Sequence, residues 1–329
     1  MESADTTGND KAPRRITEMT PAITEETDEA ITDAYIDEMV LHVEANPEVF
    51  DLLNAASGEC RERLEKLDII REELTGFLNA VEARFEDGMG ERQRVKEALA
   101  LMLKLHINQS DRVASGLPAV AHPLAVAAQT LAMYNYADAS YVIAAALLHD
   151  SIEDQSRLLT LEKRLVQEKG GKLVTQIFQE REGALNGLGY LFGYRVQVLV
   201  ESLTSPELLK DDAVAQEKKN EVYRAYVDQI FNDSTGTSAA AVIKWADLQE
   251  NAFIGDLFAG AAQARERGDT HAAERIMDLY IKLKGKYEPV LRHVRDFFTI
   301  VTPQHPLYAQ REEAIAKIED ALANQYTLA

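Results

Sequence analysis

The sequence predicts an all-α fold, and three observations support this class. Apolar residues recur at helical spacing in most long segments, strand-type alternation is scarce, and β-branched clusters are few. The chain has 329 residues, 46% of them hydrophobic, which is enough for a large core in one or two domains. We therefore expect a helical bundle with extra helices at its N-terminal and C-terminal ends.

The predicted elements divide the chain into four regions. Residues 1–25 are charged and small polar, as is typical of a disordered tail. Residues 26–90 show helical spacing, and we interpret them as a helical region that packs on the next domain or forms a homo-oligomer contact. Residues 91–262 are the predicted central domain, which follows the break EDGMGE. Residues 263–329 contain further helices that we expect to pack on it.

Charge and cysteine content restrict the partners and the compartment. The net charge of −20 argues against a nucleic-acid-binding protein, which needs a basic surface. No apolar stretch is long enough to span a membrane, and the N-terminus lacks the apolar core of a signal peptide. Cys60 is the only cysteine, which excludes an internal disulfide. We expect a cytoplasmic protein whose partner is a small molecule.

The segment AALLHDSIEDQ is the strongest functional signal. His149 and Asp150 follow an apolar run, and Glu153 and Asp154 lie one helical turn beyond Asp150. An apolar helix gains nothing from an imidazole and three carboxylates unless they meet a metal, a base or water. This segment therefore predicts a metal-dependent hydrolase.

Two other segments carry complementary groups. His122 stands just before Pro123 at the start of an apolar run, which predicts that His122 is a helix N-cap or its neighbour. In AAAVIKWADLQENA, the residues Lys244, Asp247 and Asn251 have i, i+3 and i+7 spacing. A helix would place these three side chains on one stripe.

Together, these segments offer two imidazoles and two carboxylates as metal ligands, from His122, His149, Asp150 and Asp247. This mixture suits Mn²⁺ or another divalent transition metal such as Fe²⁺ or Zn²⁺. Such a metal activates water and polarises a phosphoryl oxygen. Glu153 and Asp154 would then transfer protons as the candidate catalytic residues. Taken singly, each feature also has a simpler explanation as a helix cap or a solvated helix end.

The ordered motifs resemble the HD superfamily of metal-dependent phosphohydrolases. More narrowly, they resemble the hydrolase domain of the RelA/SpoT-homologue family and the small stand-alone alarmone hydrolases. The resemblance covers about residues 95–260, within the region that we assign to the HD hydrolase domain. It rests on His106, Gln109, Arg112, Gly116, Pro118, His122-Pro123, LLHDSIED, the segment from Phe192 to Thr204, and KWADLQEN.

The resemblance implies a function and a set of roles. It implies hydrolysis of the 3′-pyrophosphate of ppGpp and pppGpp, with Mn²⁺ on the four ligands and the Glu-Asp pair as the mark of hydrolase-competent members. It also implies that nucleotide is bound by a further set of residues. These substrate-binding candidates are Arg112, Ser115, Lys244 and Asn251.

The chain departs from the family pattern at three places. Ala119 replaces a tyrosine, Glu250 replaces an aromatic residue or histidine, and about thirty residues, 161–191, separate two motifs that are usually closer. Two alternatives therefore stay open. Beside the expected alarmone hydrolase, the chain could be an HD phosphohydrolase of another nucleotide or a non-catalytic HD-fold regulator.

Overall fold

The computed structural model describes residues 65–107, 109–112, 116–156, 180–210, 213–232 and 238–326. Within these ranges all regular structure is helical and no strand occurs, which confirms the predicted all-α class. The predicted N-terminal tail, most of the predicted N-terminal helical region and most of the segment 161–191 lie outside the described residues.

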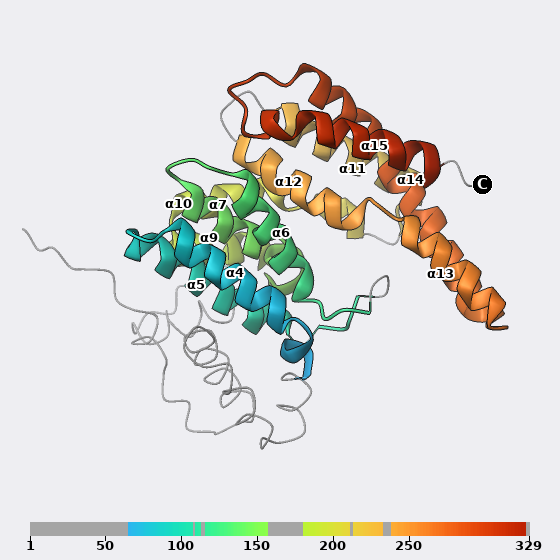
Figure 1. The fold of residues 1–329 in the computed structure, drawn as a ribbon, viewed down its shortest axis with the longest axis horizontal. Coiled ribbons are helices and arrows are strands. Elements are labelled where there is room, and N and C mark those ends of the chain that lie inside the picture. Colours follow the sequence, from blue (N-terminus) through green and yellow to red (C-terminus); the bar gives the residue numbers. More distant parts are fainter. Residues whose placement is uncertain are drawn as a thin grey trace, which may run out of the picture.

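Four helices form one half of the described structure (Figure 1). They are α4 (Arg71–Arg84), α5 (Met89–His106), α6 (Ala121–Met133) and α7 (Ala139–Leu148). The turn between α4 and α5 coincides with the predicted break EDGMGE. Every residue of α7 except Tyr141 is buried, because α5, α6 and α10 all pack against it. The apolar run AAALL thus forms a helix in the interior, at whose end the His149-Asp150 pair follows.

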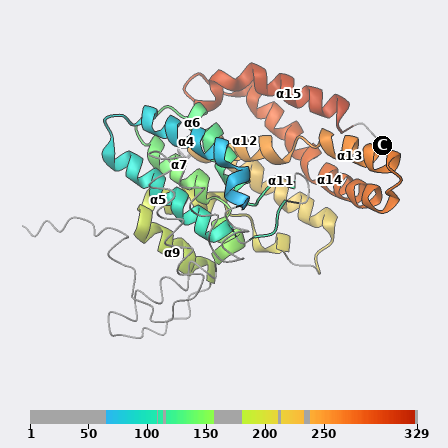
Figure 2. The same ribbon diagram turned by 60° about the horizontal axis from the view of Figure 1, so that its bottom comes forward.

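Helix α12 (Ser238–Asn251) joins this half to the remainder of the structure. It is buried continuously from Ala239 to Leu248 and packs on α6, α7, α10 and α11. Figures 1 and 2 both show it between the α6–α7 pair and the C-terminal helices. Two further helices, α9 (Glu180–Phe192) and α10 (Tyr194–Leu203), pack on each other beside α7.

The other half consists of long amphipathic helices. These are α11 (Gln216–Asn232), α13 (Gly255–Glu266), α14 (Thr270–Ile300) and α15 (Arg311–Asn324), with two short 3₁₀ turns, η2 (Glu207–Lys210) and η3 (Pro306–Gln310). Helix α14 packs on α11, α13 and α15. One continuous apolar core runs from Leu67 to Tyr326, so all described helices contribute to a single packed unit.

One prediction about a helix end is wrong. Val120 is the N-cap of α6, and His122 lies inside the first turn, directly after Ala121. Pro123 is therefore the third residue of the helix. A proline is tolerated there because the first-turn N–H groups have no partner within the helix. This shift turns the His122 side chain into the bundle, where it is only 7% exposed.

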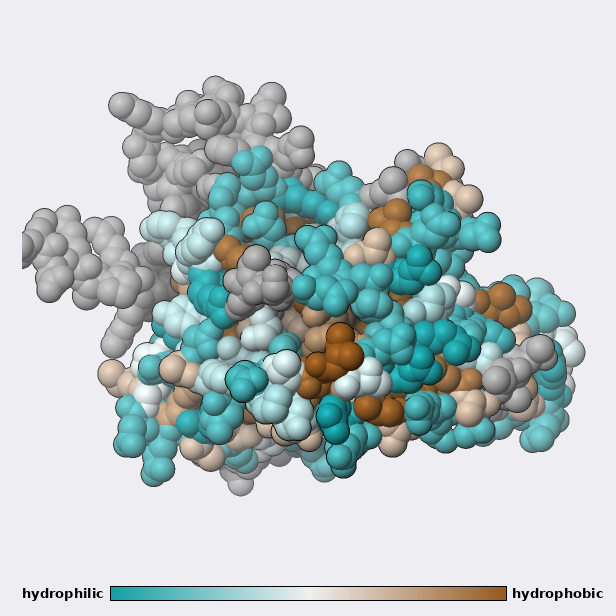
Figure 3. All heavy atoms as spheres, turned by 90° about the horizontal axis from the view of Figure 1, so that it is seen from above, coloured by the Kyte–Doolittle hydropathy of each residue, from teal (hydrophilic) through white to brown (hydrophobic). Residues whose placement is uncertain are grey.

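The surface agrees with the acidic composition. The face shown in Figure 3 is predominantly hydrophilic, with small separate apolar areas. Lys218 pairs with Glu221 on the exposed side of α11, so Lys218 belongs to a solvated helix face. None of the helices in the described part of the chain combines the length and the hydrophobicity needed to cross a membrane.

The aromatic contact between α12 and α14 provides a test of the core. Phe298 is fully buried, and its ring centroid lies 5.0 Å from that of Trp245. Phe298→Ala should lower the free energy of unfolding by about 3–5 kcal/mol, because it removes buried contacts and leaves a cavity. Ile300→Ala on the same helix is the control, since Ile300 is 74% exposed and its loss should cost less than about 0.5 kcal/mol. Urea denaturation measures both; equal effects would contradict the packing.

Candidate metal centre

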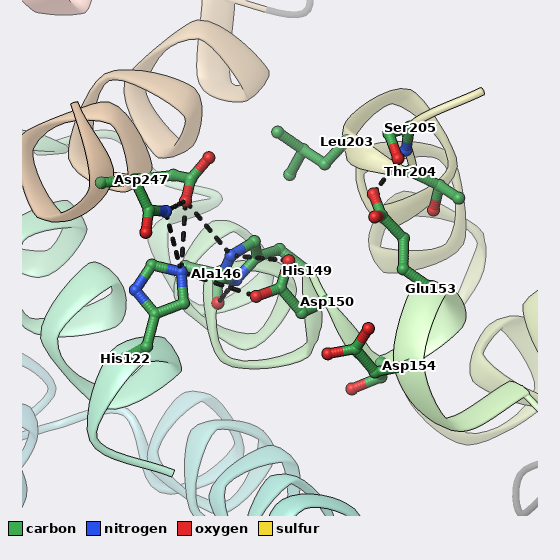
Figure 4. A network of polar contacts seen from close by, with 12 residues as sticks. His122, Ala146, His149, Asp150, Glu153, Asp154, Leu203, Thr204, Ser205 and Asp247 are labelled. Carbon is green, nitrogen blue, oxygen red and sulfur yellow. Dashed lines mark hydrogen bonds and ion pairs between the residues drawn. The ribbon is translucent and has the colours of Figure 1, made fainter. Parts of the chain in front are cut away.

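Three helices bring the four predicted metal ligands together (Figure 4). His122 comes from the first turn of α6, His149 and Asp150 follow α7, and Asp247 comes from the last turns of α12. Since α12 packs on both α6 and α7, the three segments meet in the interior of the bundle. The structure thus places the four side chains in one cluster, as the sequence predicted.

Hydrogen bonding prepares His149 to act as a ligand. Its Nδ1 lies 2.8 Å from the carbonyl oxygen of Ala146 and donates to it, so the proton is on Nδ1. The other ring nitrogen, Nε2, is buried and makes no hydrogen bond. Asp150 Oδ1 is only 3.2 Å from Nε2, but the two groups are not aligned as donor and acceptor. A histidine held by a backbone carbonyl with a free opposite nitrogen is the usual arrangement of a metal ligand.

The remaining distances define a compact donor set. Ligand atoms of His122, His149 and Asp150 all lie within 4.8 Å of one another. Asp247 lies outside that set but beside both imidazoles, with Oδ1 3.2 Å from His122 Nε2 and 3.8 Å from His149 Nε2. His122 Nε2 is also 3.5 Å from Asp150 Oδ2. Two imidazoles and two carboxylates facing a common point fit a divalent transition metal.

The carboxylate of Asp247 is anchored by its own helix. Lys244 Nζ donates to Oδ2 at 2.7 Å, and Asn251 Nδ2 donates to Oδ1 at 2.6 Å. The predicted i, i+3, i+7 stripe on α12 is therefore present. Lys244 is buried, and its ammonium lies 5.3 Å from the rings of both Tyr223 and Tyr226. The sequence offered Lys244 as a substrate-binding residue, whereas the structure places its ammonium on the Asp247 carboxylate.

Electrostatics keep the carboxylates ionised. Burial by itself raises the pKa of Asp150 and of Asp247, but the imidazoles lower that of Asp150 and Lys244 lowers that of Asp247, so both end below their usual range. Burial alone would lower the pKa of His149, yet the Asp150 and Asp247 carboxylates raise it to about 9 in the metal-free protein. A cation is therefore stabilised at the centre of this cluster.

The four side chains of the cluster differ in their exposure to solvent. The side chains of His149, His122 and Asp247 are 3%, 7% and 8% exposed, whereas that of Asp150 is 33% exposed. The exposed side continues toward Asp154, whose side chain is 44% exposed. A substrate would therefore reach the cluster past Asp150.

The Glu-Asp pair is held in two different ways. Glu153 Oε1 accepts from the backbone N–H of Ser205 at 2.5 Å, and Lys210 bonds the Glu153 carbonyl oxygen. Asp154 Oδ2 lies 3.5 Å from Gln109 Nε2, and its Oδ1 lies 3.7 Å from Lys210 Nζ. Figure 4 shows the Glu153 side chain directed toward Ser205, while Asp154 lies separately from that contact. Asp154 is therefore the less constrained of the two carboxylates.

The predicted substrate-binding residues are only partly assembled. Arg112 Nη2 bonds Asn251 Oδ1, so these two residues meet beside Asp247 although they are far apart in sequence. Ser115 lies outside the described residues. Glu250, which departs from the family pattern, accepts a bond from Gln129 of α6. A carboxylate is therefore exposed next to Asn251.

A cavity of about 480 Å³ lies behind this region, among α9, α10, α11 and α12. Arg181, Ser205 and Tyr226 are among its lining residues, but none of the four predicted metal ligands is. Its volume is within the range of small-molecule pockets. The titratable cluster around Asp150 thus lies outside the lining of this cavity.

Several contributing residues were not found from the sequence. Four residues contact the predicted site residues, namely Ser205, Lys210, Tyr223 and Tyr226. The only available signal was the amphipathic pattern of α11, which carries both tyrosines at i and i+3 but does not show what they face. Ser205 contributes a backbone group, which no side-chain pattern can reveal.

Comparison with known proteins gives no match. No protein-family model, no curated protein and no solved structure matches the chain.

Removal of one imidazole tests the donor set. His149→Ala should abolish stoichiometric binding of Mn²⁺, because a transition-metal site that loses a ligand binds far more weakly. His271→Ala is the matched control, since the His271 side chain is 92% exposed on α14. Isothermal titration calorimetry measures both. Full Mn²⁺ binding by His149→Ala would show that the cluster is not the metal site.

The raised pKa of His149 predicts a pH dependence of the metal-free protein. The pKa is about 9 when folded, compared with about 6.5 when unfolded. Its contribution to stability is therefore complete below about pH 6.5 and is lost as the pH rises through about 9. The facing groups are Asp150, Asp247 and His122. Asp150→Asn removes one of the two charges that raise this pKa, so the decline should flatten. Denaturation in EDTA across this range checks it, and identical slopes would contradict the assignment.

Proposed function

We propose that this protein is a metal-dependent phosphohydrolase. The observation that carries the proposal is the convergence of two imidazole nitrogens and two ionised carboxylates, among which Asp150 is the most exposed. A buried cluster of this composition has no role in folding, because an apolar interior gains nothing from it. Perturbed titratable groups at a concave site are typical of catalysis.

The four ligands would hold a divalent transition metal, with Mn²⁺ as the expected ion. When bound, the metal supplies Lewis acidity toward water and toward a phosphoryl oxygen. His149 is held in the correct tautomer by Ala146, and Asp247 is kept ionised by Lys244. These residues therefore orient the donors before any metal arrives.

The Glu-Asp pair, Glu153 and Asp154, would carry out proton transfer. Glu153 and Asp154 lie one turn beyond Asp150, on the open side of the cluster. A carboxylate there can take a proton from the attacking water or give one to the leaving group. The ammonium of Lys210 touches both residues and can balance negative charge on a departing phosphate.

The proposed substrate is a guanosine alarmone such as ppGpp, which would lose its 3′-pyrophosphate to give GDP or GTP. This substrate comes from the resemblance of the motifs to the RelA/SpoT-homologue hydrolase domain. The contact of Arg112 with Asn251 beside Asp247 supports it, since a guanidinium and an amide there can bind phosphate and nucleoside. The cytoplasm, where nucleotides occur, is the expected compartment.

A second candidate is an HD phosphohydrolase that acts on a different nucleotide. The exposed carboxylate of Glu250, held by Gln129 and adjacent to Asn251 in the chain, favours it, because a negative charge beside a nucleotide site repels a substrate with two pyrophosphate groups. A non-catalytic regulator would retain the metal ligands but would have no use for the Glu-Asp pair.

The substrate is tested by product analysis. The full chain with Mn²⁺ should convert ppGpp to GDP and intact pyrophosphate, resolved by anion-exchange chromatography. Glu153→Gln should retain Mn²⁺ but lower kcat on the order of 100-fold, as expected for acid–base work. Orthophosphate release, or turnover of dNTPs with ppGpp untouched, would move the protein to the second candidate. Bound Mn²⁺ without any turnover would indicate a regulator.

A further inference from the structure

A third buried histidine, beside His122 and His149 of the cluster, stands next to the candidate centre and has no role in the proposal above. His106 is the last residue of α5 and is only 2% exposed. Its Nδ1 lies 2.9 Å from Gln109 Oε1, and its Nε2 lies 3.3 Å from Ser151 Oγ. Burial lowers the pKa of His106, which favours the neutral ring. Both ring nitrogens therefore have partners at the edge of the cluster.

The partners determine the direction of each hydrogen bond. An amide oxygen only accepts, so the His106 proton is on Nδ1 and is donated to Gln109. Nε2 then accepts from the Ser151 hydroxyl, which adjoins Asp150 in the chain. The reverse orientation of the Gln109 amide would place its oxygen against the Asp154 carboxylate, where two acceptors repel.

The same orientation directs the Gln109 amide nitrogen to Asp154. Gln109 Nε2 lies 3.5 Å from Asp154 Oδ2. The backbone at Gln109 is also fixed, because Lys66 Nζ donates to its carbonyl oxygen at 3.0 Å. A contact of this length in a protein without substrate can shorten when the reacting groups assemble.

We infer that His106 and Gln109 are positioning residues for Asp154, the less constrained carboxylate of the Glu-Asp pair. The imidazole N–H fixes the orientation of the Gln109 amide. The amide in turn fixes the orientation of the Asp154 carboxylate, which takes part in proton transfer. This inference rests on the proposed function. It adds a fixed orientation for Asp154 to the proposed roles, whereas Glu153 is oriented separately by the Ser205 N–H.

Two substitutions of His106 separate positioning from packing. In His106→Asn the side-chain amide nitrogen occupies the place of Nδ1 and can still donate to Gln109. In His106→Gln the amide reaches the place of Nε2 instead, so the donor to Gln109 is lost. Gln109→Ala removes the amide between His106 and Asp154. Because Gln109 is only partly buried, this variant tests the inference even if the histidine variants do not fold. His305→Gln is the control, because His305 is a partly buried histidine near η3.

The expected pattern is a split in kinetic parameters with the full chain, Mn²⁺ and ppGpp. His106→Gln and Gln109→Ala should lower kcat by on the order of 10- to 100-fold, with KM and Mn²⁺ content nearly unchanged. His106→Asn should restore most of kcat, and His305→Gln should have no effect. Equal losses in His106→Asn and His106→Gln, or loss of Mn²⁺ in step with kcat, would overturn the inference.

A spectroscopic measurement keeps this inference separate from the proposed function. In ¹⁵N NMR the His106 ring should show the Nδ1–H tautomer with a slowly exchanging proton, and Gln109→Ala should make that proton exchange fast. If wild-type protein hydrolyses no nucleotide, the proposed function fails while this signature still reports on the contact. An Nε2–H tautomer, or a proton unaffected by Gln109→Ala, would overturn the positioning role directly.

Discussion

The candidate centre depends on one buried ion pair, between Lys244 and Asp247 in α12. Both side chains are 8% exposed, and the surrounding helix is apolar. An unpaired carboxylate at such a place would be neutralised or expelled, because desolvation of a charge is costly. The Lys244 ammonium, with Tyr223 and Tyr226 on its other side, supplies the compensating charge. The Asp247 carboxylate can therefore face the two imidazoles as an anion.

Small residues make this arrangement possible. Helix α7 contains three consecutive buried alanines, Ala144–Ala146, and α12 begins with three more, Ala239–Ala241. Such residues let helices pack closely, so the ends of α6, α7 and α12 meet at one point. The Ala146 carbonyl also accepts from His149 Nδ1, so a residue with no functional side chain still orients a ligand. The same apolar helices thus pack the core and orient the polar cluster.

The solvent exposure of the side chains changes steadily across the cluster. Exposure rises from His149 through Asp150 to Asp154 and then to Lys210. The two imidazoles and Asp247 are therefore shielded from solvent, whereas the side chains of Asp154 and Lys210 are exposed to it. A low-dielectric interior strengthens electrostatic contacts to a bound ion, whereas proton carriers need contact with water and substrate.

Much of the fold and of the candidate site could be predicted from the sequence, because these features depend on residues that are neighbours in the chain. Helical periodicity determined the all-α class, and the i, i+3 and i+7 spacing of Lys244, Asp247 and Asn251 placed them on one stripe of α12. The apolar run before His149 predicted a buried helix that ends at a polar pair. The clustering of segments rested on the chemistry of the side chains, since imidazoles and carboxylates in apolar surroundings need one another.

The tertiary structure alone decided which partner each group takes. Spacing on α12 allowed Lys244 to face either substrate or Asp247, and packing against the tyrosines of α11 selected Asp247. The backbone N–H of Ser205 reaches Glu153 across 52 residues, and Gln129 reaches Glu250 across 121. Local sequence determines periodicity because it acts through adjacent backbone and side-chain geometry. Contacts across such separations depend instead on how the helices pack, which no single segment specifies.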